Sequence, residues 1–389
     1  MNFMAPKRLL IVTHTFLPHV GGIERVVYEQ STRLMRMGFE VTVLTSKMNT
    51  PQRYSVGGVE VHCYDSLNAA FGLGIPYPVP QVNCFEPFYK LVNQASLVHV
   101  HGHPYLSSLY AAKLARLLGK PVVLTQHNTF IEYESGLWDH IEWLNDATVG
   151  KQVIKSSDLV TTVSNATRRY VLSLGADPIR TKVLRNGVDV DRFKPSSTAR
   201  DSVRKKLGID PEAIVIVTVR RLVYKNGIDT LIESARIALK QNPRLVFLAV
   251  GTGPDRDDVQ AKIQQLGISG EFKLAGFVSD ADLPAYYNAA DVFVLPSKSG
   301  EGLPLVSLEA MSTGLPVIAT NVGGIREVMT ESCGKLIPAD EPEQMADAII
   351  EFSKMGLSEV KSVVRSVAER AFSWEENVKR LIETYEELI

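Results

Sequence analysis

The chain has 389 residues, of which 45% are hydrophobic and 22% are charged, and its formal net charge at pH 7 is −1. This length favours two domains over a single core, and the near-zero charge argues against a nucleic-acid binder, which usually carries a strong basic excess. Three cysteines without a CxxC pair indicate neither a disulfide framework nor a zinc site, and they favour a reducing, cytoplasmic location.

The first half of the chain alternates buried-strand patterns with amphipathic-helix patterns. This rhythm predicts a parallel sheet with helices on both faces. The expected strands are residues 9–13, 41–45, 97–100, 122–125 and 159–163. The expected helices are residues 24–37, residues 105–118 and a third helix capped by Ser164 or Asn165.

The second half repeats this rhythm after an irregular segment, residues 193–197, that is typical of a linker. Its expected strands are residues 214–219, 245–250, 272–275, 292–295, 317–319 and 335–337. We therefore expect an α/β fold with two Rossmann-like domains, residues 1–192 and residues 199–371, that face a deep cleft. A last helix begins at residues 372–375 and runs to the C-terminus.

The most informative segment is residues 295–310, in which a short strand runs into a Ser/Gly loop and then a helix. We expect this helix to start near Leu303, with Pro304 in its first turn, where the missing N–H of proline costs nothing. A glycine-rich loop before a helix N-terminus suits a phosphate. Glu309 lies about 9 Å along the helix, at ~1.5 Å per residue. A diphosphate at the helix end would have a ribose near Glu309 and a sugar near Glu301, which predicts a sugar-nucleotide site.

Glu301 and Glu309 form an E-x7-E pattern, and five other motifs accompany it along the chain. They are Gly21-Gly22-Ile23-Glu24, Gln126-His127-Asn128, Asn186-Gly187-Val188-Asp189, Gly251-Thr252-Gly253-Pro254 and Gly323-Gly324-Ile325-Arg326-Glu327. In this order the motifs resemble those of the retaining GT-B glycosyltransferases of the family 4 type (group 1 glycosyl transferases), over almost the whole chain. The resemblance implies a GT-B fold whose last helix, residues 372–389, crosses back to the N-terminal domain.

The resemblance also implies an activity. Members move a hexose from a nucleotide sugar, with UDP or GDP as candidate nucleotides here, to a hydroxyl of a lipid-linked, glycan or small-metabolite acceptor. They retain the anomeric configuration and need no metal or other cofactor. Residues 1–190 hold 18 Lys and Arg against 14 Asp and Glu. This excess fits either a peripheral position at the cytoplasmic face of a membrane or unequal solvated surfaces.

The resemblance assigns roles to residues of this chain. The expected catalytic residues are His127, which would face the donor sugar, Arg221 and Lys225, which would neutralise the leaving diphosphate, and Glu301. The other expected donor-binding residues are Gly21, Gly22, Asn226, Val278, Gly302, Leu303, Leu305 and Glu309. The expected acceptor-side residues are His14, Glu24 and Tyr133. For Gly21 and Gly22, a tight turn with positive φ is the structural alternative.

One segment departs from the family pattern, which usually reads Gly-Arg-Leu, a few residues and then Lys-Gly. Here Arg220 takes the glycine place, Arg221 the arginine place and Asn226 the lysine place, with Lys225 one residue earlier. Three interpretations are open. Lys225 moves into the lysine role, which we favour; Asn226 donates a neutral hydrogen bond while Arg220 supplies the second charge; or the activity is weakened or lost. The last interpretation leads to the alternative function, a non-catalytic sugar-nucleotide-binding paralogue or assembly subunit.

Two further groups of residues have open interpretations. His99, His101 and His103 share one face of a strand if the strand runs that far, but Gly102 and Pro104 end it, and we expect no metal site. The segment 130–143 carries Phe130, Tyr133, Trp138 and Trp143, which would stack on an acceptor sugar, rest at a lipid interface or pack in the core. A dinucleotide oxidoreductase is disfavoured because no G-x-G-x-x-G follows the first strand.

Overall fold

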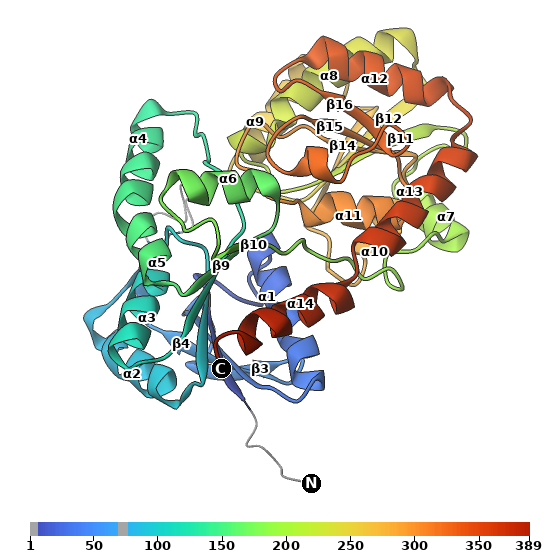
Figure 1. The fold of residues 1–389 in the computed structure, drawn as a ribbon. Helices are drawn as coiled ribbons and strands as arrows, with labels where there is room; N and C mark the ends of the chain where they lie inside the picture. The colour runs from blue at the N-terminus through green and yellow to red at the C-terminus, as the bar shows by residue number, and fades with distance from the viewer. Residues whose placement is uncertain (1–6, 69–76) are drawn as a thin grey trace. The chain divides into compact units, whose positions relative to one another are not determined.

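The computed structural model describes residues 7–68 and 77–389 and shows an α/β protein (Figure 1). The chain forms two compact units. Unit 1 comprises Met1–Phe130, Ser135–Asn186 and Trp374–Ile389. Unit 2 comprises Ile131–Glu134 and Gly187–Ser373. Each unit contains its own mostly parallel sheet with helices packed on it, so the expected pair of Rossmann-like domains is confirmed.

Unit 1 is built on a sheet with the strand order β10-β9-β8-β7-β1-β2-β4-β3, in which only the β3–β4 pair is antiparallel. Its strands are β1 (Arg8–Val12), β2 (Glu40–Ser46), β3 (Arg53–Val56), β4 (Val59–Tyr64), β7 (Leu97–His101), β8 (Val122–Gln126), β9 (Leu159–Thr162) and β10 (Thr181–Val183), with a separate pair β5 (Ser66–Leu67) and β6 (Val79–Pro80). Its helices are α1 (Gly22–Arg36), η2 (Val82–Cys84), α2 (Phe85–Gln94), α3 (Leu106–Leu117), α4 (Gly136–Asn145), η3 (Asp146–Gly150), α5 (Lys151–Ser156), α6 (Asn165–Ser173) and α14 (Trp374–Glu386).

Unit 2 is built on a fully parallel sheet with the strand order β13-β12-β11-β14-β15-β16. Its strands are β11 (Ile214–Val219), β12 (Leu245–Val250), β13 (Phe272–Gly276), β14 (Val292–Leu295), β15 (Val317–Thr320) and β16 (Gly334–Ile337). Its helices are α7 (Ser197–Lys206), η4 (Tyr224–Asn226), α8 (Ile228–Gln241), α9 (Arg256–Gln265), α10 (Leu283–Asn288), α11 (Leu305–Ser312), η5 (Ile325–Glu327), α12 (Pro342–Lys354) and α13 (Leu357–Ala371).

The continuous apolar strands are explained by two-sided burial. In β1, Leu9 and Ile11 enter one core cluster of unit 1, whereas Leu10 and Val12 enter another. Successive side chains of a strand point to opposite faces, so a strand covered by helices on both sides is apolar throughout. All the strands that the sequence predicts are present, with shifts of a residue or two at some ends. The choice of cap for α6 is also resolved, because Ser164 Oγ accepts from the Thr167 amide.

In each sheet the chain reverses its direction of strand addition at one point. In unit 1 this switch lies between β1 and β7, and in unit 2 it lies between β11 and β14. Loops that leave the carboxyl ends of two such neighbouring strands run to opposite faces of the sheet and leave a crevice where ligands bind. Both switch points therefore coincide with motifs that the sequence singles out.

The last helix, α14, lies beside α1 in unit 1 (Figure 1). Gln30 Nε2 of α1 donates to Asn377 Oδ1 over 3.0 Å, and Tyr385 bonds to His99 of β7 over 2.7 Å. Trp374 is buried at the start of this helix, with the Arg33 guanidinium 5.9 Å from its ring centroid. The chain thus returns to its first domain after completing the second.

The border between the units differs from the expected one at residue 192. Unit 2 already begins at Gly187, because the Val188 amide donates to Phe372 O over 2.8 Å and Phe193 packs against Tyr287. The expected linker, residues 193–197, therefore lies inside unit 2, where Ser196 caps α7.

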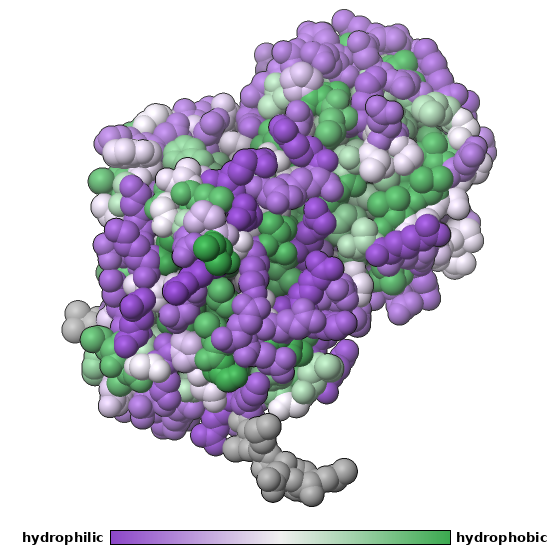
Figure 2. All heavy atoms as spheres, viewed as in Figure 1, coloured by the Kyte–Doolittle hydropathy of each residue, from purple (hydrophilic) through white to green (hydrophobic). Residues whose placement is uncertain are grey.

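Of the helices within residues 7–68 and 77–389, none combines the length and the apolar character needed to cross a membrane. Figure 2 shows hydrophilic side chains over much of the face in view, with hydrophobic side chains between them.

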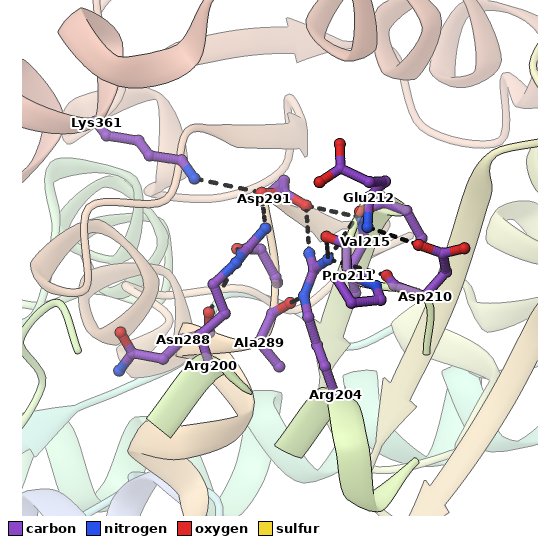
Figure 3. Close-up of polar contacts among 12 residues, drawn as sticks. Arg200, Arg204, Asp210, Pro211, Glu212, Val215, Asn288, Ala289, Asp291 and Lys361 are labelled. Atoms are coloured by element: carbon purple, nitrogen blue, oxygen red, sulfur yellow. Dashed lines mark hydrogen bonds and ion pairs between the residues drawn. The ribbon is translucent and has the colours of Figure 1, made fainter. Parts of the chain in front are cut away.

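A buried ion cluster around Asp291 joins four elements of unit 2 (Figure 3). Asp291, directly before β14, accepts from Arg200 and Arg204 of α7 over 2.8 and 2.7 Å and from the Val215 amide of β11 over 2.9 Å. Lys361 of α13 lies 3.4 Å from the same carboxylate. This cluster lies at the amino ends of β11 and β14, opposite the end where ligands bind, so we assign it to stability.

We predict that Asp291→Asn lowers the free energy of unfolding by about 3–5 kcal/mol, because it leaves two arginines and a lysine without their counter-charge. Chemical denaturation measures this loss. The control is Glu212→Gln, since Glu212 is exposed and its ion pair with Arg244 spans 3.8 Å; this change should stay within about 0.5 kcal/mol. Equal effects of the two substitutions would contradict the assignment.

Candidate functional site

The candidate site of unit 2 lies at the β11–β14 switch point. The loop after β11 carries Arg220 and Arg221, and η4 follows with Lys225 and Asn226. The loop after β14 carries Glu301. The switch brings these two loops together although about eighty residues of sequence separate them.

Four polar side chains, Arg220, Asn226, Ser297 and Glu301, form what we call the Glu301 cluster. Arg220 Nη2 donates both to Glu301 Oε1 over 2.8 Å and to Asn226 Oδ1 over 2.9 Å. Arg220 Nη1 donates to Ser297 Oγ over 2.9 Å, and Ser297 Oγ donates to Glu301 Oε1 over 2.6 Å. The Arg220 side chain is only 6% exposed. The Glu301 side chain, 16% exposed, therefore has a counter-charge and two hydrogen bonds.

The Glu301 carboxylate remains ionised in this setting. Burial by itself raises the pKa of Glu301, but the charges of Arg220 and Lys225 and the hydrogen bond from Ser297 outweigh it, so the pKa is lowered. Burial lowers the pKa of Arg220, and Glu301 opposes that change. The effect of Lys225 on Glu301 places the lysine near the cluster. Arg221, in contrast, is exposed to solvent.

Glycines allow the loops around Glu301 to pack backbone against backbone. Gly227 has a φ of 67°, and a Cβ there would lie 1.9 Å from Pro296 O. Gly323 has a φ of 62°, and a Cβ there would lie 1.8 Å from Glu301 O. No other residue fits at these two positions without moving the backbone, which explains why glycine motifs surround Glu301 in the sequence.

Helix α11 begins later than the sequence suggests. Its first residue is Leu305, and Pro304 is the cap with an extended ψ of 120°, so the expectation of a start near Leu303 is wrong. Gly302 and Leu303 belong to the loop. The reason is that proline disfavours the helical conformation in the residue before it, so Leu303 cannot begin a helix. Glu309 consequently lies about 6 Å along the helix, at ~1.5 Å per residue, and not 9 Å.

Glu309 is held by a tyrosine that sequence reasoning missed. Tyr287 of α10 donates to Glu309 Oε2 over 2.8 Å, and both residues are buried. Burial and the nearby Glu309 charge raise the pKa of Tyr287 well above its ordinary value, so it stays a hydrogen-bond donor. Nothing in the local pattern marks Tyr287, since it also serves as a core residue. Val278 follows the edge strand β13, two strands away from β11.

The candidate site of unit 1 lies at the carboxyl ends of β1, β7 and β8. His14 follows β1 and stacks on Tyr105 with a centroid distance of 3.9 Å. His127 follows β8 and hydrogen bonds through Nε2 to His101 Nδ1 over 2.9 Å. His101 was not assigned a role from the sequence, although its place at the end of β7 is a usable signal. The structure thus brings His14 and His127 into one polar cluster.

Four buried histidines of unit 1, His14, His99, His101 and His127, are neutral at physiological pH. Burial lowers the pKa of His14, His99 and His127 to about 3, and it lowers that of His101 as well. Each neutral imidazole has one N–H that donates and one ring nitrogen that accepts. Buried imidazoles of this kind orient partners but do not titrate near pH 7.

The glycines before α1 make room for a carboxylate. Gly21 has an extended φ of −164°, and neither Gly21 nor Gly22 has a positive φ, so the tight-turn alternative is wrong. A Cβ on Gly21 would lie 2.4 Å from Glu24 Oε2. Glu24 is buried and accepts from Thr15 Oγ1. It faces its own loop, where it stabilises the turn that carries the helix N-terminus.

Tyr133 is placed differently from the expected acceptor side. Its segment, Ile131–Glu134, belongs to unit 2, because the Glu132 amide donates to Ser299 Oγ over 2.9 Å. Core packing of the aromatic segment is also wrong for Trp143, which is 57% exposed on α4. This leaves the stacking and lipid-interface interpretations of Trp143 open.

The three histidines around β7 have separate protein partners. His99 and His101 lie on β7, and His103 lies beyond it, with Nε2 2.7 Å from Asp146 Oδ1. In the part of the chain that the structure describes, no group of three or more His, Cys, Asp or Glu side chains is arranged to hold a metal ion.

Comparison with known proteins agrees with this geometry. The chain is 30% identical to a D-inositol 3-phosphate glycosyltransferase of Geodermatophilus obscurus, over 94% of this chain and 84% of that protein. It is 28% identical to a GDP-mannose-dependent alpha-(1-6)-phosphatidylinositol monomannoside mannosyltransferase of Mycobacterium tuberculosis, over 89% of each chain.

Solved structures share the fold. The Anabaena protein Alr3699/HepE, in complex with UDP and glucose, superposes with a TM-score of 0.81 at 20% identity, covering 98% of this chain and 100% of that one. Sucrose-phosphate synthase of Thermosynechococcus elongatus superposes with a TM-score of 0.79 at 21% identity, covering 98% and 99%. These likenesses confirm the GT-B fold.

Two family descriptions match nearly the whole chain between them. Residues 20–192 match Glycosyltransferase Family 4, and residues 199–370 match Glycosyl transferases group 1. With the relatives and the fold, these matches show that the chain belongs to the group 1, family 4 type of glycosyltransferases.

Proposed function

We propose that this glycosyltransferase moves a hexose from a nucleotide-sugar donor to a hydroxyl acceptor with retention of configuration and without a metal ion. The observation that carries the proposal is the ionised, largely buried Glu301 at the β11–β14 switch point, which pairs with Arg220 and precedes the start of α11. Relatives that use GDP-mannose and a structural neighbour that binds UDP-glucose support a nucleotide-sugar donor.

In the proposed donor complex, Glu309 accepts hydrogen bonds from the ribose hydroxyls while Tyr287 fixes its other side. The diphosphate contacts Arg221, Lys225 and the first amides of α11. Amides at a helix N-terminus have no intrahelical hydrogen-bond acceptor. Glu301 and the Gly302 and Leu303 backbone bind sugar hydroxyls. These assignments follow the resemblance and the geometry of unit 2.

The proposed reaction exchanges one bond at the anomeric carbon. The bond to the phosphate oxygen breaks, and a bond to the acceptor oxygen forms on the same face of the sugar. The acceptor proton goes to the departing phosphate oxygen, while Arg221 and Lys225 stabilise the charge that develops on it. His127 contributes a neutral imidazole to the sugar, and His14 and Glu24 support the acceptor side.

The acceptor is proposed by class. Relatives named for D-inositol 3-phosphate and for a phosphatidylinositol monomannoside support a polyol or sugar hydroxyl, either soluble or lipid-linked. A peripheral, cytoplasmic-face location fits a lipid-linked acceptor. The alternative function, a non-catalytic sugar-nucleotide binder, is favoured only by Asn226 at the lysine place.

We predict that one nucleotide among UDP, GDP and ADP, or one of their sugars, raises the thermal stability of the protein in the presence of EDTA. At about 100 times Kd the gain is ~2.7 kcal/mol. Glu309→Gln should reduce this shift because it removes the charged ribose acceptor, whereas Glu331→Gln, an exposed glutamate of the same unit, should leave it unchanged. No shift with any nucleotide would contradict the donor site, and a shift without turnover would favour the non-catalytic alternative.

Loss of either Arg221 or Lys225 should slow the reaction. We expect Arg221→Ala to abolish turnover and Lys225→Ala to lower kcat by about 10² or more, because each removes a charge that balances the leaving diphosphate. Steady-state donor hydrolysis or transfer measures both. A normal rate in Arg221→Ala would overturn its assignment, and a normal rate in Lys225→Ala would transfer the role to the Arg220–Asn226 pair.

The rate should not depend on protonation of His127 near neutral pH. Burial lowers the pKa of His127 from 6.5 to about 3, so the neutral form that the reaction uses is present throughout the range from pH 5 to pH 8. We predict that kcat/KM profiles of the native protein and of His127→Gln have the same shape and differ by a constant factor. An acid limb near pH 6.5 that disappears in His127→Gln would contradict this.

A further inference from the structure

One nitrogen atom of Arg220 donates hydrogen bonds to both Asn226 and Glu301. Arg220 Nη2 donates to Asn226 Oδ1 over 2.9 Å and to Glu301 Oε1 over 2.8 Å. The asparagine and the glutamate therefore approach the same point from two sides, and a positive charge occupies that point. The guanidinium is also bound to Ser297 Oγ, so its orientation is fixed.

Asn226 is oriented by two contacts with opposite polarity. Its oxygen accepts from Arg220, and its Nδ2 donates to Arg221 O over 2.6 Å. Residue 226 is buried. A lysine at this position would bring an ammonium group against the Arg220 guanidinium and would remove the acceptor of one of its N–H groups. Arginine at 220 thus requires a neutral acceptor at 226.

The reverse dependence also holds. Glycine at 220 would leave the Glu301 carboxylate without the ion pair that keeps it charged in a buried place, which is costly when one partner alone is removed. A lysine at 226 can extend into the vacated space, because the Nη2 position is within hydrogen-bond distance of both residue 226 and Glu301. The cation that pairs directly with Glu301 can therefore come from position 220 or from position 226, but not from both.

We propose that Arg220 and Asn226 act as one exchangeable charge unit, in which Arg220 is a positioning residue that holds the Glu301 carboxylate in place for the donor sugar. This inference rests on the proposed function for the role of Glu301, but the pairing itself is a property of unit 2. It has a functional consequence. In this proposal, the positive charge that the family has on a lysine at position 226 is carried here by Arg220. The donor site therefore remains catalytically competent although residue 226 is asparagine.

The test is a double-mutant cycle of the full chain: the native protein, Arg220→Gly, Asn226→Lys and the combined variant. Donor hydrolysis gives kcat and KM with the nucleotide sugar that the native protein uses, and thermal unfolding gives Tm. We expect each single substitution to lower kcat by about 30-fold or more, and the combined variant to recover to within about 5-fold of the native rate. The Tm values should follow the same order.

A matched control removes the positive charge of the neighbouring Arg221 instead of Arg220 and adds one at position 226. Arg221→Gly combined with Asn226→Lys keeps the same net charge but leaves Arg220 in place, so it should stay as inactive as Arg221→Gly. If Arg220→Gly alone does not fold, recovery of folding in the combined variant supports the pairing. If neither folds, Arg220→Gln replaces it in the cycle, because glutamine keeps most of the side-chain volume.

Two results would overturn the inference. One is a combined variant whose kcat loss equals the product of the single losses, which means that the two positions do not exchange the charge. The other is recovery of Tm without recovery of kcat, which means that the pair serves stability only. A native protein without nucleotide affinity or turnover refutes the proposed function and the positioning role together, whereas the Tm cycle then still decides whether the two residues exchange the charge.

Discussion

The candidate site of unit 2 depends on one largely buried ion pair, between Arg220 and Glu301. A carboxylate in a buried position is costly unless a counter-charge and hydrogen bonds offset its lost hydration. Arg220, Asn226 and Ser297 form the ion pair and hydrogen bonds that offset this cost. They lie in the segments that follow the two strands at the switch point of unit 2. The glycines that let these loops touch, Gly227 and Gly323, follow from the same requirement, because a side chain on either would push Glu301 or its neighbours away.

The candidate sites of the two units differ in charge: side chains in unit 2 are ionised, whereas the buried histidines in unit 1 are neutral. In unit 2, the permanent charges of Arg220 and Lys225 act on an ionised glutamate, and Arg221 follows Arg220 in the same loop. Unit 1 gathers imidazoles that burial keeps neutral, with His127 oriented by His101. Charges suit a diphosphate, whose own charge grows as it leaves, whereas neutral donors and acceptors suit the hydroxyls of a sugar.

Much of the fold could be predicted because buried strands appear in the sequence as continuous apolar runs. Apolar runs such as residues 214–219 and 245–250 coincide with β11 and β12 in full. The motifs at strand ends also identified the E-x7-E glutamates and the departure at Arg220 and Asn226. Element ends were less accurate: Pro304 delays α11 by its effect on the preceding residue, and Val188 and Phe193 join unit 2 through contacts with residues far along the chain.

Other features could not be predicted because they arise only from tertiary contacts. Tyr287 looks like any core tyrosine until α10 brings its hydroxyl to Glu309. His101 acquires its partner through the pairing of β7 with β8, and Tyr133 joins unit 2 through the contacts of its neighbour Glu132 with Ser299. The bonds from Arg220 to Asn226 and Glu301 likewise appear only in the folded structure. Sequence shows which residue types are present at the site, and packing decides which of them face one another.

The most direct measurement is a crystal structure of the protein with its bound nucleoside diphosphate. The account predicts a ribose on Glu309, a terminal phosphate against Arg221, Lys225 and the Leu305 amide, and Arg220 still bonded to Asn226 and Glu301. A nucleotide bound elsewhere on the protein, or one whose phosphate draws Arg220 away from Glu301, would contradict it.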